Sequence, residues 1–115
     1  HIIYFSHIIS GYFFDHGYQV IVAHNGFEAL ARVEETLPNI ILMDIQMPKL
    51  DGLETMRRLR EDSRFASTPI IALTALAMPG DRELCLEAGA SEYLSKPVNL
   101  KELVKLTNTL LVREL

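Results

Sequence analysis

Short apolar runs alternate along this chain with segments of helical periodicity, which limits the chain to a fold of alternating strands and helices. The runs at 39–44 (NIILMD) and 69–74 (PIIALT) are almost wholly apolar, as expected for strands covered on both faces. The runs that predict strands are 2–5, 18–23, 39–44, 69–74 and 91–95. Because helical segments separate them, with short connections, the sequence predicts an α/β fold built on a parallel, doubly wound sheet.

The segments between the runs carry helix signals. Three have a capping residue with a glutamate three positions later: Asn25 with Glu28, Asp51 with Glu54, and Asn99 with Glu102. Another helix is expected to begin near Pro79 and stop at Gly89. Apolar positions mark one face of each predicted helix, and those of the helix after Pro79, which are Leu84, Cys85 and Ala88, are expected to point inward. The positions in the other three helices are Leu30, Val33 and Leu37; Leu53, Met56 and Leu59; and Leu103, Val104, Thr107, Leu110 and Leu111.

Composition narrows the class of protein. A length of 115 residues suits one domain, 1–115, and the formal net charge of -4 gives no basic footprint for nucleic acid or an anionic membrane. The expected binding partner is therefore another protein or a small anion. The single cysteine, Cys85, is interpreted as a buried structural residue in a reducing compartment, and no apolar run reaches membrane-spanning length. These features predict a cytoplasmic protein without membrane contact.

Three polar residues fall where predicted strands end. Asp44 ends one strand, Thr74 ends the next, and Lys96 follows the last. In doubly wound sheets the functional crevice lies at the carboxyl ends of the strands, so these side chains are expected to converge. A carboxylate can attack phosphorus, a hydroxyl can bind a peripheral oxygen, and an ammonium can neutralise developing charge. The sequence therefore predicts a site that handles a phosphoryl group.

The motifs MDIQMPKLDG, ALTALAMPGD and CLEAGASEYLSKP resemble the receiver domain of two-component response regulators, especially receivers of hybrid sensor histidine kinases. The likeness runs from about Gly17 to the C-terminus. It implies a flavodoxin-like, five-stranded sheet of order 2-1-3-4-5 and a phosphorelay switch rather than an enzyme, with at most self-phosphorylation from phosphodonors and slow autodephosphorylation. Asp44 would accept phosphate from a histidine kinase or phosphotransfer protein. Thr74 would supply the switch hydroxyl, and Lys96 would be the lysine that the family places before a proline.

The resemblance assigns further positions. Tyr93 would be the aromatic switch residue, and Pro97 would follow the lysine through a cis peptide. Met47 and Pro48 would shape the loop after the acceptor. Magnesium would be held by Asp44 and the backbone carbonyl of Gln46, together with a pair of acids at the end of the first strand.

That acid pair is absent, because no Asp or Glu precedes Asp15. Ser6, His7 or their neighbours would occupy its positions, and the helix that follows is shorter than in the family, so residues 1–16 form an atypical N-terminal segment with an altered or truncated first strand and helix. Loss of two nearby charges is expected to weaken Mg²⁺ binding by roughly a hundredfold or more. An engineered N-terminus, residues missing between Ser6 and His7, and a natural variant would each explain the absence.

The missing acids also leave different functions open. The chain could be a receiver-like interaction module that works without phosphorylation, and a dimer or a swapped first strand stays open. A dehalogenase-type phosphatase is disfavoured because Gln46 stands where such enzymes place a second Asp. Flavin binding is disfavoured because no phosphate-cradling loop rich in Gly or in Ser and Thr follows a predicted strand. The four histidines show no spacing that converges on a metal: His1, His7, His16 and His24.

Overall fold

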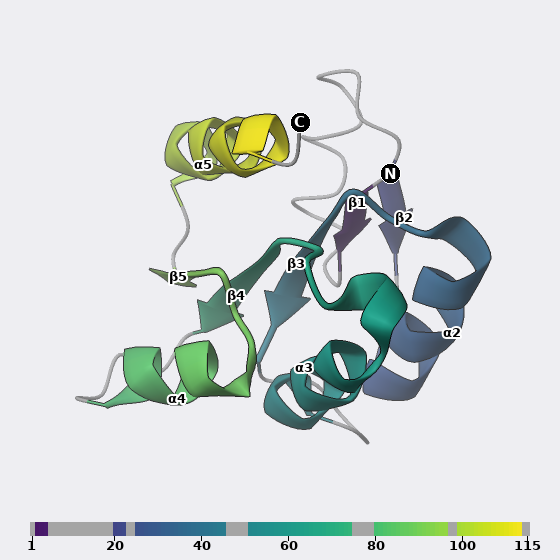
Figure 1. Ribbon diagram of the computed structural model, residues 1–115. Coiled ribbons are helices and arrows are strands. Elements are labelled where there is room, and N and C mark those ends of the chain that lie inside the picture. Colours follow the sequence, from purple (N-terminus) through teal and green to yellow (C-terminus); the bar gives the residue numbers. More distant parts are fainter. Residues whose placement is uncertain are drawn as a thin grey trace.

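The computed structural model describes residues 2–4, 20–22, 25–45, 51–74, 80–96 and 99–113, and the fold is given for these (Figure 1). The elements in chain order are β1 (Ile2–Tyr4), β2 (Val20–Val22), α2 (Gly26–Thr36), β3 (Ile40–Asp44), α3 (Gly52–Glu61), the 3₁₀ turn η1 (Ser63–Phe65), β4 (Ile70–Thr74), α4 (Asp81–Ala88), β5 (Glu92–Ser95) and α5 (Leu100–Arg113).

The strands form one parallel sheet in the order β2-β1-β3-β4-β5, so the α/β class predicted from the sequence is confirmed. This order is the one that the receiver resemblance implies. β1 lies between β2 and β3, with Ile3 opposite both Ile21 and Ile41. β3 and β4 form the centre of the sheet, and every residue of the two strands except Asp44 is buried.

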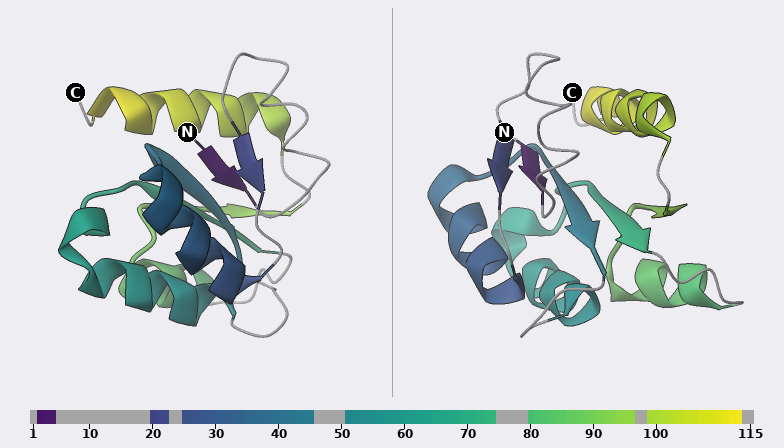
Figure 2. Two further views of the ribbon diagram at one scale, coloured as in Figure 1. Left: turned by 90° about the vertical axis from the view of Figure 1, so that its right-hand side faces the viewer. Right: turned by 180° about the vertical axis from the view of Figure 1, so that it is seen from behind.

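Helices cover both faces of the sheet. α2, α3 and α4 lie on one face and α5 on the other (Figures 1 and 2). Successive strand residues point to opposite faces, and two cores result. The first packs Ile41, Met43, Ile70 and Ala72 against the three helices, and the second packs Ile40, Leu42, Ile71 and Leu73 against α5. This double coverage explains why the strand runs are apolar at consecutive positions.

The predicted helix caps are confirmed. In each case the side-chain oxygen of the capping residue accepts a hydrogen bond from the backbone N–H of the glutamate three positions on, which satisfies one of the free N–H groups of the first turn. The distances are 2.9 Å from Glu28 to Asn25, 2.9 Å from Glu54 to Asp51, and 3.1 Å from Glu102 to Asn99.

Two apolar positions differ from the sequence prediction. Leu84 was expected to point inward, but it is 49% exposed, while Cys85 and Ala88 are buried. Leu86 packs partly buried beside these two residues, so the inner face of α4 is turned toward Leu86 and away from Leu84. Leu37 is also exposed, because it lies one residue beyond α2 in a left-handed conformation (φ 47°) and caps the helix through its N–H to Val33 O.

Some of the sequence predictions fall outside the described residues. They concern the first helix and the acid-pair positions in 5–19, and the segments 46–50, 75–79 and 97–98. Phe5 and Pro79 belong to this group. Within the described part of the chain, no helix combines the length and the apolar character needed to cross a bilayer.

Candidate functional site

Asp44, Thr74 and Lys96 lie together at the carboxyl edge of the sheet. Asp44 is the last residue of β3 and Thr74 the last of β4, and the register places Thr74 opposite Ser95 in β5. The backbone N–H of Lys96 donates to Thr74 O at 2.7 Å, which fixes the start of the turn after β5. Three adjacent parallel strands thus deliver the carboxylate, the hydroxyl and the ammonium to one edge.

An ion pair joins the first and last of these residues. Lys96 Nζ lies 2.5 Å from Asp44 Oδ2, and the two side chains are 33% and 13% exposed. The lysine therefore supplies a positive charge within reach of any group attached to the carboxylate, in surroundings that are only partly solvated. At such a position charge interactions are screened less than on an open surface.

Thr74 and Tyr93 share one face of the sheet. Tyr93 is half-buried in β5 opposite Ala72 and packs against the core formed with α2, α3 and α4. Side chains two residues apart on a strand point the same way, so Thr74 follows Ala72 onto this face and lies diagonally next to Tyr93. Thr74 is 2% exposed, which places its side chain beneath the edge rather than in solvent.

Gly52, which the sequence reasoning did not single out, holds the chain close beneath the acceptor. Its N–H donates to Ile45 O at 3.3 Å. A Cβ at this position would lie 2.7 Å from Asp44 O and 2.8 Å from Ile45 Cα, so only glycine fits without a backbone shift. The Asp-Gly dipeptide between a strand and a helix was the available signal.

The described side chains alone do not fit the magnesium that the resemblance implies. Among them no group of three or more His, Cys, Asp or Glu could hold a metal ion. Asp44 is a carboxylate at the edge, and it is already paired with Lys96. Mg²⁺ is held by oxygen ligands, usually one or two carboxylates, so these donors make at most a weak site. Ser6, His7, Gln46, Met47, Pro48 and Pro97 lie outside the described residues.

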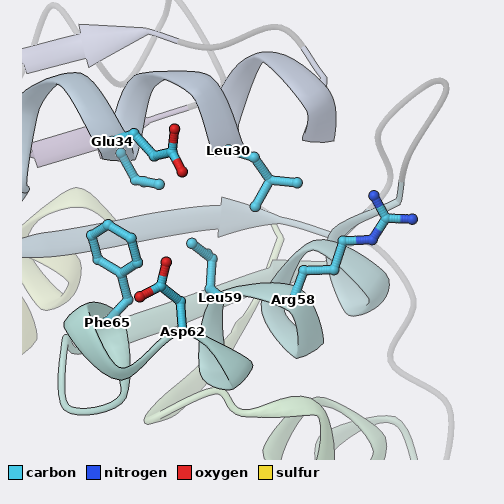
Figure 3. Close-up of a pocket in the computed structure, with 7 residues that line it drawn as sticks. Leu30, Glu34, Arg58, Leu59, Asp62 and Phe65 are labelled. Carbon is cyan, nitrogen blue, oxygen red and sulfur yellow. The ribbon is translucent and has the colours of Figure 1, made fainter.

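A separate groove of about 190 Å³ lies between α2 and the end of α3 (Figure 3). Its floor is apolar, with Leu30, Val33, Leu59 and Phe65, and Glu34, Arg58 and Asp62 stand at its rim. Arg64 bridges the rim, at 3.2 Å from Glu34 Oε1 and 2.7 Å from Asp62 Oδ2. Hydrogen bonds from Arg64 lower the pKa of the Asp62 carboxyl. None of the strand-end site residues lines this groove.

The fold and this edge define a parallel α/β domain with an acidic residue, a hydroxyl and a lysine at successive strand ends. The chain belongs to the response regulator receiver domain family, whose model matches residues 4–108. It is accordingly a receiver domain of two-component signalling, as the resemblance implied.

Individual relatives of this chain are response regulators or receiver domains as well. The polar-differentiation response regulator DivK of Brucella anthropi is 42% identical over 89 residues, 77% of this chain and 72% of that protein. The Francisella response regulator 1452 receiver domain superposes with a TM-score of 0.90 at 29% identity, over 99% of this chain and 97% of that one. The receiver domain of sensor histidine kinase PA1611 from Pseudomonas aeruginosa, with magnesium coordinated in its active site cleft, has a TM-score of 0.81 at 33% identity and covers 96% and 94%.

Proposed function

We propose that residues 1–115 form one phosphorelay receiver that accepts a phosphoryl group on Asp44 from a histidine kinase or phosphotransfer protein in the cytoplasm. The observation that carries the proposal is the pairing of Asp44 with Lys96 at 2.5 Å beside the buried Thr74, at the edge where doubly wound sheets bind ligands. The family membership and the sensor-kinase receiver among the relatives support the choice of donor.

The transfer step needs a carboxylate, a phosphorus centre and charge neutralisation. An Asp44 oxygen attacks the phosphorus of a phosphohistidine, a P–O bond forms, and the P–N bond breaks with its electron pair returning to the imidazole, which takes up a proton. Lys96 stabilises the negative charge that gathers on the phosphoryl oxygens, because its ammonium already lies beside Oδ2. Hydrolysis of the resulting acyl phosphate resets the domain slowly.

The proposed readout runs through Thr74 and Tyr93. An aspartyl phosphate brings roughly 1.5 to 2 negative charges and strong acceptor oxygens to the edge. The Thr74 hydroxyl can donate to one of these oxygens and move toward Asp44. Tyr93, its diagonal neighbour on the same face, can then change position and alter the surface around β5 that a partner reads.

Magnesium is expected to assist only weakly. Asp44 and the backbone carbonyl of Gln46 are the proposed ligands of this chain, and bound Mg²⁺ would neutralise phosphoryl charge. The acid pair is absent from the sequence, so the neutralisation of charge at the acceptor is assigned to Lys96, whose ammonium lies beside Asp44.

A second function is favoured by that same absence. A receiver that has lost its magnesium ligands can act as an interaction module that signals through its surface without phosphorylation. The two functions differ in one observable property, which is covalent modification of Asp44.

Intact-protein mass spectrometry after incubation with a small phosphodonor, with and without Mg²⁺, separates them. We expect a single phosphoryl adduct on the wild type and none on Asp44→Asn. Asp51→Asn is the matched control, because Asp51 is a nearby exposed carboxylate and asparagine also caps a helix well. An unmodified wild-type protein in both conditions would reject the receiver function and favour the interaction module.

A further inference from the structure

Arg60, near the end of α3, binds the backbone of two other segments. Its Nε donates to Gly89 O at 2.9 Å and its Nη1 donates to Phe65 O at 2.6 Å. Phe65 ends η1, and Gly89 follows α4, so one partly buried guanidinium joins three elements. Hydrogen bonds from a charged donor to backbone carbonyls are stronger than neutral ones, and the planar guanidinium can make both at once.

The segment that Arg60 holds is closely fitted. Gly89 has a φ of 122°, and a Cβ there would lie 2.5 Å from Arg60 Cγ. The Gly89 N–H caps α4 by donating to Cys85 O and Leu86 O. The apolar attachment of α4 consists of the buried residues Cys85 and Ala88, with Leu86 packed partly buried against the same core. The Arg60 contact adds a charged hydrogen bond from α3 to the backbone at the C-terminal end of α4.

β5 begins three residues after Gly89, contains Tyr93 as its second residue and is followed directly by Lys96. Ser91 N donates to Ile70 O at 2.7 Å, and Ile70 N donates to Ser91 Oγ at 3.1 Å. At the far end of the strand, Lys96 N donates to Thr74 O. The strand is thus tied at both ends, and Arg60 holds the turn that leads into it.

We propose that Arg60 is a positioning residue, which fixes the turn from α4 into β5 and through it the placement of Tyr93 and Lys96 at the phosphoryl edge. Its link to phosphorylation rests on the function proposed for Asp44. The positioning itself does not, because the contacts are present in the unmodified chain.

Backbone amide NMR and hydrogen exchange on the unmodified protein test this. Arg60→Met should speed exchange in α4 and β5 by about tenfold or more, leave α5 unchanged, and shift the Lys96 amide resonance. Arg60→Lys keeps the charge but cannot reproduce the planar fork, so its effects should be intermediate and in the same direction. Arg57→Met is the control, because Arg57 is exposed on the same helix and forms an ion pair with Glu54, a residue of that helix.

Resonances of β5 and Lys96 that match the wild type in both Arg60 variants would overturn the proposal. An equal rise in exchange throughout the protein would also overturn it, since that pattern means a general loss of stability. If Arg60→Met does not fold, Arg60→Lys is judged by the same two criteria. Neither measurement needs a phosphodonor, so failure of Asp44 to accept phosphate is recognised separately.

Discussion

Replacing Gly52 with alanine should destabilise the protein and misplace the acceptor. Alanine is favoured over glycine in a helix by about 0.5–1 kcal/mol. Here, however, the new methyl group would lie 2.7 Å from Asp44 O and 2.8 Å from Ile45 Cα, and both are backbone atoms that cannot rotate away. Overpacking of this kind costs about 1–3 kcal/mol, so we expect a net loss of about 1–2 kcal/mol in the free energy of unfolding.

The strain falls on the residue that carries the carboxylate, so modification of Asp44 by a phosphodonor should slow by roughly tenfold in Gly52→Ala. Urea denaturation and a mass-spectrometric time course measure the two effects. Gly80→Ala is the control. Gly80 has a φ of 93°, and no atom of the described residues lies within 4 Å of the added Cβ, so this variant should lose stability through backbone strain and leave the Asp44 rate less affected. A Gly52→Ala protein as stable and as reactive as the wild type would mean that this close contact does not constrain the acceptor.

Three further predictions address the switch, the rim of the groove and the metal. Thr74→Val should still be phosphorylated but should lose the response in β5, observed as amide shifts that no longer change on addition of the phosphodonor. Because Arg64 lowers the pKa of Asp62, this pair stabilises the fold above about pH 4, and its contribution is lost as the pH falls through the lowered pKa. Arg64→Gln should therefore weaken the loss of stability in acid, measured as the free energy of unfolding between pH 2 and about pH 7. Replacing both Ser6 and His7 with Asp should increase the acceleration of phosphorylation by Mg²⁺ about tenfold or more, and an unchanged metal dependence would place the missing acids elsewhere.

Local rules account for the parts of the fold that the sequence predicted best. Asn25, Asp51 and Asn99 cap helices because the acceptor and its N–H lie three residues apart, a relation visible in any window of sequence. The convergence of Asp44 with Lys96 is not local, yet it could be anticipated, because parallel strands bring their carboxyl ends to one edge.

Contacts that depend on tertiary packing could not be predicted in this way. Leu84 is exposed because the inner face of α4 holds Cys85, Ala88 and the partly buried Leu86, and periodicity alone does not reveal which side of the helix meets the core. The Arg60 contact with Gly89 joins residues 29 positions apart, and no local sequence pattern indicates that the two are in contact. Glycine after a helix indicated a cap, but the arginine that occupies the space above it belongs to a different helix.

The role of Asp44 as phosphoacceptor is tested by identifying the residue that carries the phosphoryl group. After treatment with phosphodonor, borohydride reduces an aspartyl phosphate to homoserine with release of phosphate, and peptide mapping then locates the altered residue. We expect homoserine at position 44 and unaltered Asp51 and Asp62 in the same digest. Homoserine at another aspartate, or none in a protein incubated with donor and Mg²⁺, would mean that Asp44 is not the phosphoacceptor.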